Sequence, residues 1–152
     1  MSKKVVVLGL GNLLLKDEGI GIHIVKRLQK QDLPEDVEIL DGGSASLDAL
    51  NFAKGAAKLI IVDAICCGKD PGTIYRLKNK ELYQTLDSKK LSLHQFSLLE
   101  ALNIHKRMGS LPEEIVFIGI EPGSIDWGLE VTEVIKEKIP EIIRLVTKEI
   151  PN

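Results

Sequence analysis

Long apolar runs and a strong charge of either sign are both missing from this chain of 152 residues. No run approaches the roughly 18 apolar residues that a membrane-spanning helix needs. The formal net charge at pH 7 is −2, so the chain lacks the electrostatic footprint of a protein that binds nucleic acid or an anionic membrane. We therefore expect neither a nucleic-acid partner nor a membrane partner.

Cysteine is also scarce, because Cys66 and Cys67 are the only two. Adjacent cysteines can bridge to each other only with strain, and a chelating pair normally has a spacing such as C-x₂-C. A structural disulfide and a cysteine metal site are both disfavoured. The basic start before Val5 looks faintly like a signal peptide, but the apolar run is short and Asp17 and Glu18 close it. We expect a cytoplasmic protein.

Strand and helix patterns alternate along the whole chain, without repeats or linkers. The residues 5–8, 59–62 and 115–120 are continuously apolar, which is typical of strands covered on both faces. Shorter strands are expected at 37–40 and 73–77, the latter near an edge. Helices are expected at 19–30, 44–57, 79–86, 92–108 and 131–150, and Pro140 should kink or split the last one. The pattern predicts a single α/β domain over 1–152, a three-layer sandwich with a largely parallel sheet.

Acidic residues follow the predicted strands, and a parallel sheet binds ligands at the carboxyl ends of its strands. Glu18, Asp41, Asp63 and Glu121 are in such positions. Any one of them has an ordinary explanation as a capping or turn-forming acid. Asp63 is the hardest to explain in that way, because it lies between apolar residues and a buried charge needs a partner.

A histidine is the natural partner for these acids. Ser92 and Gln95 form a capping box, which puts His94 in the first turn of a helix that can approach the same edge. A helix N-terminus disfavours imidazolium, so we expect a neutral ring that can bind a metal. Together with Glu18 and Asp63 it would form an O,O,N set suited to zinc or nickel. The other histidines, His23 and His105, are expected on the surface.

The segment Gly9-Leu10-Gly11 imitates a dinucleotide-binding loop, and Asp41 imitates the acid that binds a ribose. However, Leu14 stands where the third glycine of G-x-G-x-x-G is required. Asp17 and Glu18 would also repel a pyrophosphate at the following helix start. We therefore expect no dinucleotide.

Five motifs in order resemble one family over essentially the whole chain: GLGNLLLKDEGIG near the start, ILDGGSASL from Ile39, LIIVDAI from Leu59, LSLHQ from Leu91 and IGIEPGSIDWGLEVT from Ile118. The family is the nickel–iron hydrogenase maturation endopeptidases, which remove the C-terminal extension of the hydrogenase large subunit. The resemblance implies a five-stranded twisted sheet with one antiparallel strand, for which 73–77 is the candidate. Two details depart from the family pattern: Ser44 follows Asp41-Gly42-Gly43, and Glu130-Val131 precede Thr132.

The resemblance further implies that Glu18, Asp63 and His94 are the catalytic and metal-contacting residues, and that Asp41, Gly42 and Gly43 line the cleft. The metal is nickel, supplied by the precursor, so the isolated protein need hold none. Water would cleave the peptide bond without a covalent nucleophile, as in an aspartic-type endopeptidase, and Cys66 and Cys67 would take no part.

Two other functions are compatible with parts of the pattern. A non-cleaving chaperone would bind the same precursor as a checkpoint of metal insertion. A peptidyl-tRNA hydrolase would also open with a GLGN strand end, but it needs Pro-Gly after the asparagine. Here Asn12 is followed by Leu13.

Overall fold

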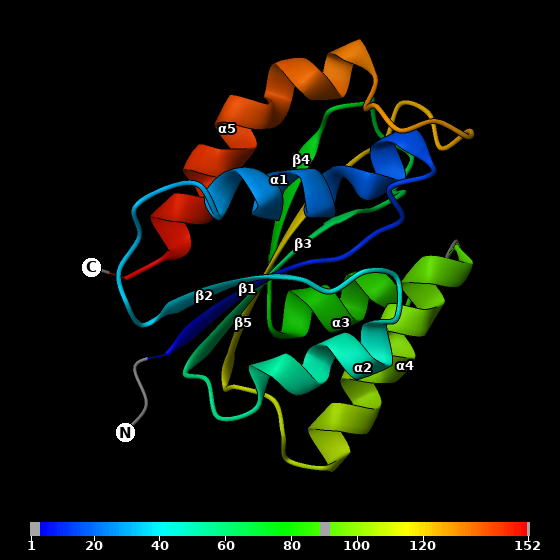
Figure 1. Cartoon of the computed structure of the whole chain (residues 1–152). Helices are drawn as coiled ribbons and strands as arrows, with labels where there is room; N and C mark the ends of the chain where they lie inside the picture. The colour runs from blue at the N-terminus through cyan, green and yellow to red at the C-terminus, as the bar shows by residue number, and fades with distance from the viewer. Residues whose placement is uncertain (1–3, 89–91, 152) are drawn as a thin grey trace.

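One mixed sheet of five strands organises the molecule (Figure 1). The computed structural model describes residues 4–88 and 92–151. The strands are β1 (Val5–Gly9), β2 (Val37–Asp41), β3 (Lys58–Ala64), β4 (Ile74–Lys78) and β5 (Glu114–Ile120). Their order is β2-β1-β3-β5-β4; all neighbours are parallel except β4, which pairs antiparallel with β5 at one edge. The predicted α/β class, the five strands and the antiparallel edge strand are confirmed.

Helices cover both faces of the sheet, as the three-layer prediction requires. They are α1 (Ile20–Leu28), α2 (Ser46–Ala49), α3 (Lys80–Leu86), α4 (Leu93–Arg107) and α5 (Glu133–Glu149), with short 3-10 helices η1 (Lys16–Gly19) and η2 (Leu50–Ala53). The helices α1 and α5 lie over one face, and α2, α3 and α4 over the other (Figure 1). No helix in the described ranges has the length and apolar content to cross a membrane.

The continuous apolar runs follow from this double cover, because successive strand residues point to opposite faces. In β1, Val5 and Val7 belong to the core beneath α1 and α5. Val6 and Leu8 belong to the second core, beneath α2, α3 and α4. Every residue of β1 and β3 is buried.

One helix prediction was wrong in detail, and of the two outcomes expected at Pro140 only the split is excluded, while the kink stays a prediction. The expected helix over 44–57 is only the short α2 followed by η2. A continuous helix would put Leu47 on the same face as the buried Leu50, but Leu47 is 47% exposed. The later start and the tighter 3-10 turns change the spacing that would have put Leu47 on the inner face. Pro140 does not split α5. It is exposed, so the carbonyl of Lys136, which loses its amide donor, can bond to water.

The carboxyl ends of the parallel strands meet at one edge of the sheet. The η1 segment follows β1 at this edge, and the segment carrying Trp127 follows β5. The start of α4 lies there too, capped by Ser92, whose Oγ accepts a hydrogen bond from the Gln95 amide at 3.2 Å. Leu91, which opens the LSLHQ motif, lies outside the described residues.

Candidate active site

Asp63 lies inside β3 rather than after it, and it is 1% exposed. Its neighbour Ile61 points into the core beneath α4, so Asp63, two residues later, points to the same side. There Asp63 Oδ2 is 2.6 Å from His94 Nε2, while Asp63 Oδ1 accepts a hydrogen bond from the Ala64 amide at 2.8 Å. A buried carboxylate is thereby paired with an imidazole at the carboxyl edge of the sheet.

The contact between Asp63 and His94 influences the pKa of both side chains. The hydrogen bond with Asp63 raises the pKa of His94; burial opposes this, and the charges of Asp63 and Glu18 add to it. Burial raises the pKa of Asp63, opposed by the same hydrogen bond. Both directions favour keeping one shared proton. The direct contact with an acid thus opposes the field of the helix N-terminus, and the neutral ring stays a prediction.

Glu18 lies in η1, the 3-10 helix that follows β1. It is partly buried, and its charge is near enough to raise the pKa of both His94 and Cys66. Its carboxylate makes no hydrogen bond within the described part of the chain. In the same residues, no group of three or more His, Cys, Asp or Glu side chains is arranged to hold a metal ion. The structure thus brings Asp63 and His94 into contact and leaves Glu18 as a nearby charge.

The loop after β3 is fixed by two further side chains. Gln95 Oε1 accepts a hydrogen bond from the Cys66 amide at 3.0 Å. Glu121 Oε1 accepts one from the Cys67 amide at 2.9 Å and one from the Tyr75 hydroxyl at 2.6 Å. Glu121, one of the four strand-end acids, therefore has a structural role here. Gln95, which the sequence indicated only as half of a capping box, links the histidine helix to this loop.

The two cysteine thiols are exposed and unpaired. Burial of part of each side chain and the charge of Glu121 raise the pKa of Cys66 and of Cys67. A thiol with a raised pKa is a poor nucleophile at neutral pH, because the thiolate is the reactive form.

The turn at Asp41-Gly42-Gly43 has a local explanation. Asp41 Oδ1 accepts a hydrogen bond from the Gly43 amide at 2.9 Å, as a turn-forming acid does. Gly43 has φ +61°, which favours glycine. A Cβ on Gly42 would lie 2.8 Å from the side chains of Leu8 and Leu10. These contacts account for the three residues without a ligand, and their role in lining a cleft stays a prediction.

Asp17 is a residue that the sequence did not single out for any role of its own. It is 1% exposed. Oδ2 accepts hydrogen bonds from the amides of Gly123 and Ser124 at 2.7 and 3.0 Å and from the Thr132 hydroxyl at 2.7 Å. Oδ1 accepts one from the Thr132 amide at 2.7 Å. Asp17 therefore ties η1, and with it Glu18, to the segment after β5.

The surface prediction was wrong for His105, while His23 is intermediate in exposure. His105 is 1% exposed, with Nε2 2.8 Å from the Leu47 carbonyl oxygen and Nδ1 2.9 Å from Ser110 Oγ. It joins α4 to α2. His23 is half-buried, and burial, with the charges of Lys26 and Arg27, lowers its pKa. Neither ring lies in the Asp63–His94 pair.

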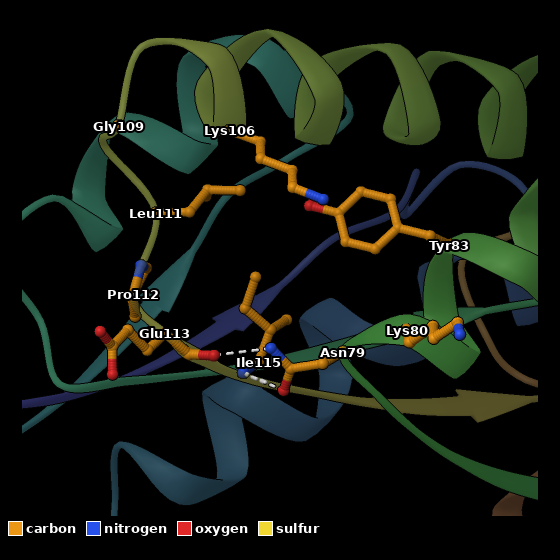
Figure 2. Close-up of a pocket in the computed structure, with 9 residues that line it drawn as sticks. All are labelled: Asn79, Lys80, Tyr83, Lys106, Gly109, Leu111, Pro112, Glu113 and Ile115. Atoms are coloured by element: carbon orange, nitrogen blue, oxygen red, sulfur yellow. Dashed lines mark hydrogen bonds between the residues drawn. The ribbon is translucent and has the colours of Figure 1, made fainter.

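A cavity of about 530 Å³ lies far from this pair, at the amino edge of the sheet. Figure 2 shows Asn79 bridging the Glu113 carbonyl and the Ile115 amide on one side of it, at 2.6 and 3.1 Å. On the other side the Lys106 ammonium lies 4.8 Å from the centre of the Tyr83 ring. The lining contains no residue of the candidate active site.

A family model and individual known proteins both match the sequence of this chain. The model of the family described as "Hydrogenase maturation protease" matches residues 22–149. The hydrogenase 2 maturation protease of Escherichia coli is 37% identical over 145 residues, which are 94% of this chain and 88% of that protein. HupD of Bradyrhizobium diazoefficiens, a hydrogenase expression/formation protein, is 35% identical over 95% of this chain and 76% of its own length.

Solved structures agree with these sequence matches. The hydrogenase maturating endopeptidase HybD of Escherichia coli superposes with a TM-score of 0.86 at 34% identity, covering 94% of this chain and 89% of that one. The [NiFe] hydrogenase maturation protease HybD of Thermococcus kodakarensis has a TM-score of 0.80 at 25% identity, covering 97% and 99%. With its mixed sheet and the family match over most of its length, this chain belongs to the hydrogenase maturation protease family.

Proposed function

We propose that this protein is an endopeptidase that removes the C-terminal extension of a nickel-loaded [NiFe] hydrogenase large-subunit precursor. Membership of the hydrogenase maturation protease family supports the reaction class. The observation that carries the proposal within this chain is the buried Asp63–His94 pair at the carboxyl edge of the sheet. A buried acid and imidazole of this kind are typical of a functional site rather than of a helix cap.

Nickel enters as part of the substrate, held by the precursor. The donor set of Glu18, Asp63 and His94 fits such an ion, because carboxylate oxygens and imidazole nitrogen are both ligands for divalent transition metals. In this structure Asp63 Oδ2 and His94 Nε2 bond to each other, so His94 Nε2 would have to leave this hydrogen bond before it could contact a metal. Recognition of the bound ion would then allow the precursor to be cleaved only after its nickel has been inserted.

The chain's own residues supply proton transfer. Asp63 orients the His94 ring through their 2.6 Å contact. Glu18, the more exposed carboxylate, is available to accept the proton of a water that attacks the scissile carbonyl and, once protonated, to return it to the leaving amine. The raised pKa of Cys66 supports water, rather than a thiolate, as the nucleophile. This is the chemistry of an aspartic-type peptidase, carried out in the cytoplasm.

The test is incubation of the purified protein with nickel-loaded precursor, followed by mass spectrometry of the precursor. Loss of the C-terminal extension supports the protease. An intact precursor in a stable complex supports the alternative, a chaperone that holds the precursor without cutting it. The same assay with nickel-free precursor should give no cleavage if the ion is what the site recognises.

Three substitutions test the site. Glu18→Gln, Asp63→Asn and His94→Ala should each reduce the cleavage rate at least a hundredfold, the scale at which positioned acid–base groups contribute. Glu100→Gln, an exposed acid on the same helix as His94, is the matched control and should cleave at the wild-type rate. Full activity in all three site variants would sink the assignment.

A further inference from the structure

Large apolar side chains are exposed in the two segments that follow β1 and β5 at the carboxyl edge of the sheet, the edge that also holds the Asp63–His94 pair. Trp127 is 77% exposed, Leu129 66% and Leu14 51%, and Ile125 is also exposed. Apolar side chains that gather on a surface, rather than scattering singly, typically mark a site that a partner covers. We call these four residues, Leu14, Ile125, Trp127 and Leu129, the apolar rim.

The apolar rim comes from two segments that the backbone joins. The Gly128 amide donates to the Leu14 carbonyl at 2.8 Å, and the Lys16 amide donates to the Gly128 carbonyl at 2.9 Å. These bonds form a parallel bridge between Leu15 and Gly128. A Cβ on Gly128 would lie 3.0 Å from the Lys16 side chain, so the two segments are in close contact. Figure 1 shows them together, the blue segment before α1 beside the orange loop before α5.

The four hydrogen bonds that buried Asp17 accepts join the same two segments a second time. Asp17 is the residue before Glu18, so a single clamp holds both the apolar rim and the predicted catalytic carboxylate. A surface fixed in this way loses little conformational entropy when a partner covers it.

We infer that the apolar rim is the docking surface for the folded body of the precursor and determines which protein substrate is accepted. This inference rests on the proposed function. The segments that carry the rim are joined to Glu18 through Asp17, so the rim and the candidate active site share one edge of the sheet. A free metal ion would need no apolar contact. A folded protein substrate, in contrast, presents apolar side chains that can cover Leu14 and Trp127.

The opposite side of the site supports the same reading. Leu93 is 87% exposed and Phe96 49% exposed, and they flank His94 in the first turns of α4. Exposed apolar side chains thus flank His94 in α4 as well as forming the apolar rim. A few clustered residues, tryptophan prominent among them, typically contribute most of the energy of a protein interface.

The experiment compares Trp127→Ala with Met108→Ala, using the nickel-loaded precursor as substrate. Met108 is 61% exposed but follows the far end of α4, so it is a matched control outside the apolar rim. We expect Trp127→Ala to raise KM at least tenfold with kcat within twofold of wild type. Met108→Ala should change neither constant. The melting temperature of each variant, compared with wild type, checks that the fold is kept.

Two results would overturn the inference. One is an unchanged KM in Trp127→Ala. The other is a wild-type protein that sediments as a dimer and becomes monomeric in Trp127→Ala without a change in KM, which would make the apolar rim a contact between copies. If the wild type cleaves no precursor, the proposed function fails instead. Binding of the immobilised precursor by wild type and by Trp127→Ala then still tests the surface, and equal affinity rejects it.

Discussion

The Asp17 clamp can be tested by a single-atom change, Asp17→Asn. The asparagine side chain has nearly the shape of aspartate but only one acceptor oxygen. If its oxygen takes the place of Oδ2, it keeps the bonds from Gly123, Ser124 and the Thr132 hydroxyl. The amide group then faces the Thr132 backbone N–H, donor against donor, where Oδ1 had accepted a bond.

The expected cost follows from these contacts. Leaving the Thr132 amide unpaired costs about 1–3 kcal/mol. The three bonds that remain change from charged to neutral, and charged hydrogen bonds are about twice as strong. Removing a buried charge offsets part of this loss. The free energy of unfolding should therefore fall by about 3 kcal/mol, mostly through the segment after β5.

The assay uses the only tryptophan of the chain, Trp127, which lies in the clamped segment. Urea unfolding followed by Trp127 fluorescence reports on that segment, while far-UV circular dichroism reports on the helices. In the wild type the two curves should coincide. In Asp17→Asn the fluorescence curve should shift to lower urea than the circular dichroism curve, because the clamped segment is released first.

A matched control is Asp126→Asn, an exposed acid in the same segment, which should stay within about 0.5 kcal/mol of wild type. Thr132→Val removes only the hydroxyl bond and should cost about 1 kcal/mol. The reasoning is refuted if Asp17→Asn unfolds with the wild-type midpoint by both probes.

Two further predictions concern stability away from the site. Glu149 bonds to Arg76 at 2.7 Å and to Lys58 at 3.3 Å, and chiefly the bond from Arg76 lowers its pKa. The stabilisation from Glu149 is therefore complete above the pKa of this group in the unfolded chain, and it is lost as the pH falls through the lower pKa of the folded protein. Glu149→Gln should lower the free energy of unfolding by about 1–2 kcal/mol at pH 7 and by nothing near pH 2. Urea unfolding at each pH measures this difference. His105→Ala should cost about 2–3 kcal/mol at pH 7, because it leaves the Leu47 carbonyl without its donor; a cost below 0.5 kcal/mol would restore the surface interpretation.

Sequence periodicity was sufficient to predict the layers of this fold. The runs at 5–8, 59–62 and 115–120 are buried on both faces, and that environment leaves an unambiguous signal. The rule that ligands bind at carboxyl strand ends then brought Asp63 and His94 to one edge, where the structure has them in contact. The boundaries of α2 could not be predicted from the sequence, because that helix is only one turn long and its apolar positions suit several registers.

The roles of individual polar residues were harder to predict, since they depend on what lies across a gap in sequence. Asp17 and Glu18 are adjacent acids with the same local pattern. Yet Asp17 is buried under four donors from residues more than a hundred positions away, whereas Glu18 faces the edge. His105 was placed on the surface because its neighbours in α4 are polar, and its partner Leu47 lies on another helix. No local spacing distinguishes these cases.

The glycines that imitate a nucleotide loop have their physical explanation in this same packing. A Cβ on Gly11 would lie 2.1 Å from the Glu18 carbonyl oxygen, and one on Gly21 would lie 2.1 Å from the Val62 carbonyl oxygen. A phosphate loop needs free backbone amides, but the Leu10 amide bonds to Val62 and the Gly11 amide bonds to Gly43. The glycines instead let η1 and α1 close on the ends of β1 and β3. That closure brings Glu18 to the edge where Asp63 and His94 meet, so the loop that resembles a cofactor site is what assembles the candidate active site.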